Sequence, residues 1–154
     1  MANEYVLSGV ADVAASTETL MSLEGATTAI GEVGYICVAA SSVLSDNMAK
    51  LEVLRTDTTL GSGGTAIGTP GKKNDLSPTA QLDGRFNHTS QPTDVSNSSL
   101  LYISLHLRNT FQWYAQQGKG LLTALSATKC IAMKHRGYSG GGPCDYTTTF
   151  HFYE

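Results

Sequence analysis

The chain has 154 residues and a mass of 16.3 kDa, the usual size of one domain. Its 15 Ser, 18 Thr and 16 Gly stand beside only 15% charged residues. This composition excludes coiled coil, disorder and collagen, and it favours strands over helices. The net charge of −3 and the pI near 5.7 argue against nucleic-acid binding, because proteins that bind nucleic acids typically carry a basic stripe.

The N-terminal segment predicts neither export nor membrane anchoring. Met1 to Tyr5 is acidic where a secretory signal is basic, and no apolar run follows it. The longest uninterrupted apolar run, Ile36 to Ala40, is far shorter than the ~20 residues that cross a bilayer. We therefore expect no membrane partner and synthesis in the cytoplasm.

Eight segments show the alternation or the β-rich composition that is typical of strands. They are Tyr5 to Val10, Thr17 to Leu23, Gly34 to Ala40, Leu101 to Leu107, Thr110 to Ala115, Gly120 to Leu125, Lys129 to His135 and residues 147–153. Leu101 to Leu107 is the cleanest example, because every second residue is apolar. Around the last segment Tyr146, Phe150 and Phe152 share one face, and Thr147, Thr149 and His151 share the other.

Residues 45–55 fit two structures. A polar residue at the start is suited to cap a helix in which apolar residues recur at helical spacing. The same residues also alternate, with Ala49, Leu51 and Val53 on one face. No glycine that would end a helix appears before Gly61, so a strand is the favoured interpretation.

Residues 58–99 contain few apolar residues and many Gly, Ser, Thr and Asn. A segment of about 40 residues without a strand exceeds the usual connection in a compact domain, and such loops are typically functional or disordered. We expect a surface excursion that a neighbouring molecule orders. A second glycine-rich turn, residues 137–143, joins the last two strands. The chain thus predicts one domain, residues 1–154, folded as an antiparallel β-sandwich of jelly-roll type with about eight strands.

The three cysteines predict no zinc site and no disulfide framework. Cys37, Cys130 and Cys144 are odd in number and form no CxxC pair. A Cys130–Cys144 disulfide is possible if their segments pair, but cytosolic synthesis favours free buried thiols. Cys37 lies in an apolar run and is also expected to be buried and inert.

No group of residues predicts catalysis. The histidines His88, His106, His135 and His151 lack metal-ligand spacing. The chain has no GxSxG motif, and its glycine clusters lack the Lys-Ser/Thr of a phosphate-binding loop. The acidic residues fall mostly in loops or on polar faces. We expect no enzyme, no metal site and no cofactor.

Two features favour binding instead. Acidic residues dominate the chain before Lys50, and Lys119, Lys129, Lys134 and Arg136 gather late in it. These groups predict either head-to-tail contacts between copies or ion pairs within one subunit. The segment 111–114 is aromatic: alternation places Phe111 and Trp113 toward the core and leaves Tyr114 to point outward.

Several short motifs in chain order resemble small virion proteins of tailed bacteriophages. They are Tyr5 to Gly9, Leu54 to Thr56, Gly61 to Pro70, Asn87 to Thr89, Arg108 to Ala115 with Gly118, and Phe150 to Glu154. Where other copies of this pattern have Pro-Gly after the aromatic segment, this chain has Gln116-Gln117-Gly118. Similar small β-rich phage proteins often serve as capsid decoration, or cement, proteins, which sit as trimers on the expanded head and clamp coat subunits.

The resemblance implies a non-enzymatic decoration protein on the virion surface. Its partners would be the major capsid protein and two further copies of itself. The residues expected to contact the coat are Lys72, Lys73, Asn74 and Leu76, which combine charge with an apolar side chain in the excursion. One alternative is a carbohydrate-binding or receptor-binding module of a tail or head fibre that stacks sugars on Tyr114 or Tyr138. Another is a structural coat or tail-tube subunit.

Overall fold

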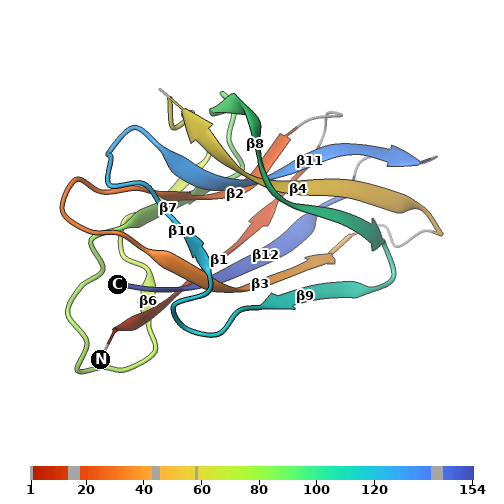
Figure 1. The fold of residues 1–154 in the computed structure, drawn as a ribbon. Helices are drawn as coiled ribbons and strands as arrows, with labels where there is room; N and C mark the ends of the chain where they lie inside the picture. The colour runs from red at the N-terminus through yellow and green to blue at the C-terminus, as the bar shows by residue number, and fades with distance from the viewer. Residues whose placement is uncertain (1, 14–17, 43–45, 58, 140–143) are drawn as a thin grey trace.

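A computed structural model describes residues 2–13, 18–42, 46–57, 59–139 and 144–154. These residues form no helix; they fold into two antiparallel six-stranded sheets packed as a sandwich (Figure 1). The described ends of the chain lie side by side, because Asn3 and Glu154 exchange backbone hydrogen bonds of 3.0 and 3.1 Å.

We call the sheet that contains both ends of the chain sheet A. Its strands are β1 (Glu4–Ala11), β3 (Glu32–Ala40), β6 (Gly71–Lys72), β9 (Thr110–Tyr114), β10 (Leu121–Leu122) and β12 (Tyr146–Tyr153). Their order is β10-β3-β12-β1-β6, and β9 also pairs with β3. Because β9 and β10 share one partner, they form an interrupted edge strand, and β6 forms the opposite edge.

The other sheet, sheet B, faces sheet A across the core. Its strands are β2 (Glu18–Glu24), β4 (Met48–Asp57), β5 (Thr65–Ile67), β7 (Asp83–Phe86), β8 (Thr93–His106) and β11 (Cys130–Ser139). Their order is β5-β7-β2-β11-β4-β8. The 14-residue strand β8 is therefore paired on one side only.

The core between the sheets follows the predicted alternation. Tyr146, Phe150 and Phe152 of β12 are fully buried, and they face Leu51 and Met133 of sheet B in one hydrophobic cluster. The alternation predicted for the last segment is confirmed, because its odd-numbered residues remain partly exposed on the opposite face. The β-sandwich prediction is confirmed as well.

The ambiguous segment is the strand β4, as favoured, and its Ala49, Leu51 and Val53 lie in the core. The expected strand from Gly120 to Leu125 is reduced to β10. There the chain turns away, because the Ser126 backbone N–H donates to the Ala124 carbonyl at 2.9 Å.

Residues 58–99 do not form the single loop that their composition predicted. They contain β5, β6, β7 and the first half of β8. These short strands form because distant strands provide backbone partners: β7 pairs with β2, and β6 pairs with β1. The predicted turn over 137–143 also begins later, since β11 runs to Ser139; residues 140–143 lie outside the described part of the chain.

The cysteines are free thiols. Cys130 and Cys144 are buried, and they belong to different parts of the sandwich, at the start of β11 and just before β12. Cys37 was expected to be buried, and that expectation is wrong. Ile36 and Val38 turn into the core, so the alternation of β3 places Cys37 half-buried on the outer face of sheet A.

Candidate functional site

The four residues predicted to contact a coat lie together in a projecting arm, which we define as residues 71–80. Lys72 lies in β6 opposite Tyr5, at the edge of sheet A. Asn74 Oδ1 accepts a hydrogen bond of 3.0 Å from the backbone N–H of Leu76, which tightens the turn. The Leu76 side chain points away from the sandwich and is 91% exposed.

The arm is fixed to the sandwich at both ends. Lys73 Nζ lies 3.0 Å from Glu4 Oε1, and the Tyr5 hydroxyl donates to the Pro78 carbonyl at 3.1 Å. Just beyond the arm, the backbone N–H of Leu82 donates to Glu154 Oε1 at 2.7 Å. These contacts hold the base of the arm beside the chain ends (Figure 1) and leave residues 71–76 exposed.

The outer face of sheet A carries a row of rings and charges that crosses four strands. Tyr35 of β3 lies at the centre, with its ring centroid 4.8 Å from that of Tyr114 on β9 and 4.6 Å from that of His151 on β12. His151 Nδ1 lies 3.2 Å from Glu4 Oε1 on β1, and Glu4 in turn meets Lys73. The strand register brings these five residues together, although the sequence separates them widely.

A groove of about 540 Å³ lies above this row. Besides the five residues of the row, it is lined by Cys37, Thr149, Tyr153 and the backbone of Gly34 and Ala115. A Cβ atom at Gly34 would lie 2.7 Å from the ring of Tyr153, so glycine allows this ring to pack over β3. A hydrogen bond to the Cys37 thiol, together with burial and the neighbouring Tyr114, raises the pKa of Tyr35 to about 12. The phenol is therefore neutral at physiological pH.

The outer face of sheet B is instead covered in part, and Tyr102 on β8 remains exposed. Its cover segment, residues 87–94, lies over β2 and β11. His88 Nε2 and Ser22 Oγ are 3.0 Å apart, and the Gln91 side chain accepts from the Thr19 backbone N–H at 2.6 Å. Leu54 of β4 and Cys130 and Ala132 of β11 are also buried, but outside the main core. Burial raises the pKa of the Cys130 thiol to about 11, so this cysteine is a packing residue.

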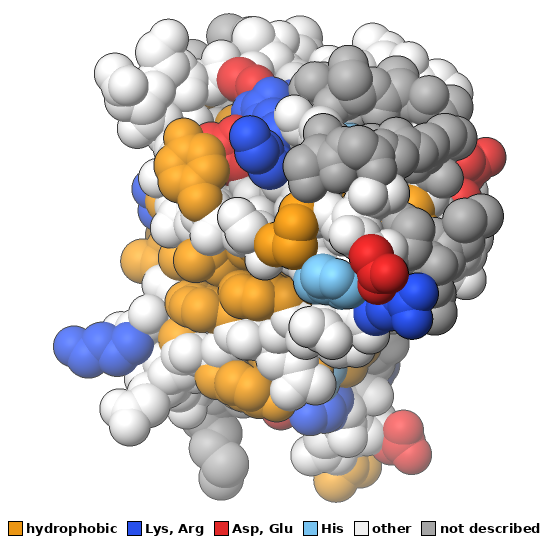
Figure 2. Space-filling view, turned by 90° about the vertical axis from the view of Figure 1, so that its right-hand side faces the viewer, with side chains coloured by type: hydrophobic (Ala, Val, Ile, Leu, Met, Phe, Trp, Pro, Cys, Tyr) orange, Lys and Arg blue, Asp and Glu red, His pale blue; other side chains and the backbone are white. Residues whose placement is uncertain are grey.

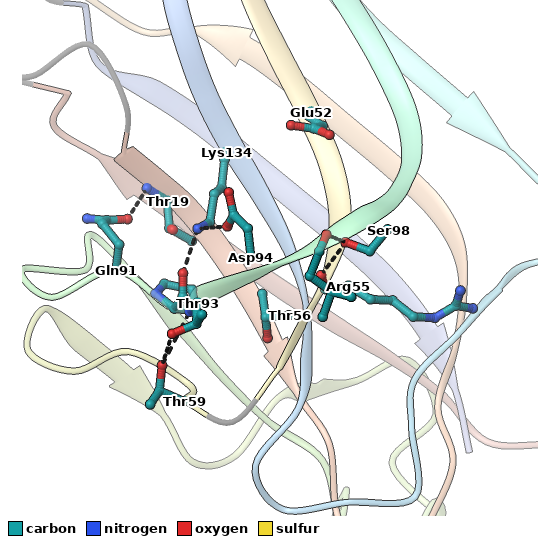
Figure 3. A network of polar contacts seen from close by, with 12 residues as sticks. Thr19, Glu52, Arg55, Thr56, Thr59, Gln91, Thr93, Asp94, Ser98 and Lys134 are labelled. Atoms are coloured by element: carbon teal, nitrogen blue, oxygen red, sulfur yellow. Dashed lines mark hydrogen bonds and ion pairs between the residues drawn. The ribbon is translucent and has the colours of Figure 1, made fainter.

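An ion network holds the cover segment to the sheet (Figure 3). Lys134 is 2% exposed; its Nζ donates to the Pro92 carbonyl at 2.7 Å and forms an ion pair with Asp94. Arg136 bridges Asp94 and Glu52 at 2.7 and 2.6 Å. Burial opposes ionisation of Asp94, but hydrogen bonds from Lys134 and Arg136 outweigh it and hold the pKa of Asp94 below its usual value.

The uneven charge distribution along the sequence is largely resolved within the subunit. Early acidic residues pair with later basic ones, as in Glu4–Lys73, Glu24–Arg85 and Asp46–Arg108. Of the late basic group, Lys134 and Arg136 pair instead with Asp94 and Glu52. Ion pairs within one chain therefore involve both groups, but these pairs do not join the early acidic residues to the late basic ones. Head-to-tail attraction between copies has less charge left to act through.

Sequence reasoning found the arm but only part of the groove. It placed Tyr114 outward and Phe111 and Trp113 against the core, and the structure confirms both placements. It also placed His151 on the polar face of the last strand, but it did not connect His151 with Tyr35 or Glu4. Tyr138, the other proposed stacking residue, lies near the end of β11, where the structure describes the backbone only.

The described residues thus define a β-sandwich with an exposed arm and an open aromatic groove. Comparison with protein-family models and with curated proteins found no match to this chain. Within the described residues, no cluster of three or more His, Cys, Asp or Glu side chains is placed to hold a metal ion. No helix in this part of the chain is long and apolar enough to cross a membrane.

Proposed function

We propose that this protein is a non-enzymatic decoration subunit that binds the outside of a bacteriophage capsid and stabilises its coat lattice. The observation that carries the proposal is the arm: a stretch of exposed residues, fixed at its base, with an almost fully exposed leucine at its tip. A large apolar side chain held this far out in water is typical of a contact residue that fills a pocket on a partner.

The partner is the major capsid protein. Leu76 enters an apolar pocket of the coat, and Lys72 lies beside it to pair with a coat carboxylate at the rim. Because the base of the arm is already fixed by Glu4, Tyr5 and Glu154, little conformational entropy remains to be lost on docking. A small subunit that needs neither cofactor nor turnover suits a role that requires many copies per particle.

The subunit functions as a homotrimer. Among the described strands none pairs with the outer edge of the 14-residue strand β8, and β9 forms an edge of sheet A. Figure 2 looks at the end of the sandwich where β8 ends and β9 begins, and it shows hydrophobic side chains gathered across the middle of that end. Contacts between copies at these edges would protect the free backbone groups of β8. Light scattering of the purified protein should give three times 16.3 kDa.

The first experiment counts this chain against the major coat protein in purified virus particles by quantitative mass spectrometry. A decoration protein is expected at a copy number close to that of the coat. A few copies per particle would instead indicate a tail or fibre module, and absence from particles would overturn the proposal.

Two pairs of variants test the arm in a binding assay with particles that lack the protein. Leu76→Ser should reduce occupancy at least ~10-fold, because it removes an apolar side chain from the centre of the contact. The control Leu125→Ser changes a leucine that is 58% exposed elsewhere on the surface, and it should bind normally. Lys72→Glu with Lys73→Glu should also weaken docking without unfolding the subunit, whereas Lys119→Glu should not. Unchanged occupancy of the arm variants would contradict this assignment.

A further inference from the structure

The groove on sheet A has a composition that packing alone does not explain. Rings from three neighbouring strands line its floor, and one of them, Tyr114, is 68% exposed although a core lies directly behind its strand. The volume of about 540 Å³ falls within the range of small-molecule sites. The rings of the groove are held by the sheet, because Tyr35, Tyr114 and His151 lie on β3, β9 and β12.

We propose that this groove is a binding site for a neutral oligosaccharide. The C–H face of a hexose ring is apolar and packs on an aromatic ring, while the hydroxyls at its rim need donors and acceptors nearby. The groove offers both. Tyr114 and Tyr35 form an apolar platform, and the Glu4 carboxylate and the Thr149 hydroxyl lie further along the same groove.

The charges in the groove favour a neutral sugar over an acidic one. Glu4 is the acidic residue of the lining, and Lys73 and His151 both contact it. Lys73 is therefore already paired with a carboxylate of the same chain, and this makes it a poor partner for a sialic acid or a sulfate. A paired carboxylate remains a good hydrogen-bond acceptor for sugar hydroxyls.

The exposed position of Tyr114 makes it the decisive residue. Its hydroxyl donates to Gln112 Oε1 at 3.0 Å on the same strand, and this contact restrains the ring. An aromatic ring that is restrained before binding loses little side-chain entropy when a ligand stacks on it. Tyr35 is packed between two other rings and lies beside Tyr114 on the neighbouring strand.

The test measures binding of the full chain to an array of neutral hexose oligosaccharides (glucose, galactose and mannose oligomers), with sialylated and sulfated glycans on the same array. We expect binding to neutral glycans, with titration of the best hit giving a micromolar to millimolar Kd. Binding confined to acidic glycans, or to none, would overturn the proposal.

A series of variants then locates the site. Tyr114→Ala should weaken binding of that glycan at least ~10-fold, whereas Tyr114→Phe should bind within about threefold of the unmodified protein because it keeps the ring. Tyr102→Ala is the matched control: Tyr102 is 76% exposed on a strand of the other sheet. If Tyr114→Ala binds like Tyr102→Ala, the groove is not the site. If Tyr114→Phe binds as weakly as Tyr114→Ala, stacking is not the mode of recognition.

Cys37 gives a second measurement that does not depend on substitution. Cys37 lines the groove and is half-buried, whereas Cys130 and Cys144 are buried. Alkylation of the native protein should therefore modify Cys37 first, and a saturating concentration of the glycan should slow this reaction. An unchanged rate at saturation would place the glycan elsewhere. This inference stands apart from capsid docking, because Tyr114 and Cys37 lie outside the arm and the assay needs no particles.

Discussion

The outer faces of the two sheets are arranged in opposite ways. Sheet B carries charges beneath a cover segment, and its Lys134, Asp94 and Arg136 are matched to one another inside the subunit. Sheet A carries rings and polar groups that line an open groove, with Lys73 at one margin. Both faces show alternating polar residues in the sequence, but on sheet B the cover segment and its ion network occupy the part over β2 and β11, whereas the aromatic row of sheet A borders an open groove.

This difference shows how polar residues on a strand divide between stability and binding. A buried charge must be paired, since leaving it alone in a low-dielectric site costs several kcal/mol, so the network of sheet B belongs to the folded state. Half-exposed ion pairs such as Glu4–Lys73 contribute little to stability because water screens them. The contrast predicts large effects on stability for one face and small ones for the other.

The largest effect is expected from Lys134→Met. This change leaves the Pro92 carbonyl and one side of Asp94 without their donor, and it should lower the free energy of unfolding by about 3 kcal/mol. Urea denaturation at neutral pH measures it. The control Lys50→Met alters an exposed lysine on the neighbouring strand β4 and should change stability by less than about 0.5 kcal/mol.

A double-mutant cycle sharpens this result. In an Asp94→Asn background, Lys134→Met should cost less than it does in the unmodified protein, because part of its partner's charge is already gone. If Lys134→Met instead lowers the free energy of unfolding equally with and without Asp94→Asn, then Lys134 acts through packing of its aliphatic stem. The ion network would in that case not hold the cover segment.

The next effect is a pH dependence carried by His88. Burial of His88 between the cover segment, to which it belongs, and β2, together with the nearby charges of Arg85 and Lys134, lowers the pKa of His88 to about 4 from an ordinary value of 6.5. Between these values the unfolded chain binds a proton that the folded protein does not. The contribution of neutral His88 to the free energy of unfolding is therefore fully present above pH 6.5. It is lost as the pH drops toward 4, which lowers stability by up to about 3 kcal/mol.

His88→Gln tests this dependence. Glutamine stays neutral and keeps a polar group near Ser22, so its stability curve should be flatter than that of the unmodified protein between pH 6.5 and 4. Chemical denaturation at closely spaced pH values gives both curves. Parallel curves over this window would show that His88 titrates alike in both states.

Strands with a clear alternation of apolar and polar residues were predicted well, because this pattern is visible within the segment itself. Residues 101–107 and 147–153 needed no partner to be recognised, and β4 was recognised from its inward-facing Ala49, Leu51 and Val53. The strands β5 and β7 were not predicted, because Thr65–Ile67 and Asp83–Phe86 show almost no alternation of apolar residues. They are strands only because β2 provides an edge to which β7 pairs, and β7 in turn pairs with β5.

Of the two candidate sites, the arm could likewise be predicted from the sequence and the groove could not. The arm could be predicted because its charge and its apolar residue are contiguous in sequence. The groove could not, because Glu4, Tyr35 and His151 meet only through the register of β1, β12 and β3. The burial of Lys134 could not be predicted either. The sequence of β11 predicts a solvent-exposed polar face, and only the structure shows the cover segment over it.

The smallest effect, and the sharpest test of the contrast, is Lys73→Ala. Its ion pair with Glu4 joins side chains that are 44% and 28% exposed. Removing the pair should therefore lower the free energy of unfolding by less than about 1 kcal/mol, and this loss should disappear at high salt. Denaturation at low and high ionic strength measures this, with Lys72→Ala as the neighbouring control. A cost as large as that of Lys134→Met would mean that the row on sheet A also supports the fold. The open face would then be a structural element that happens to be exposed, and its rings and charges would need no ligand to explain them.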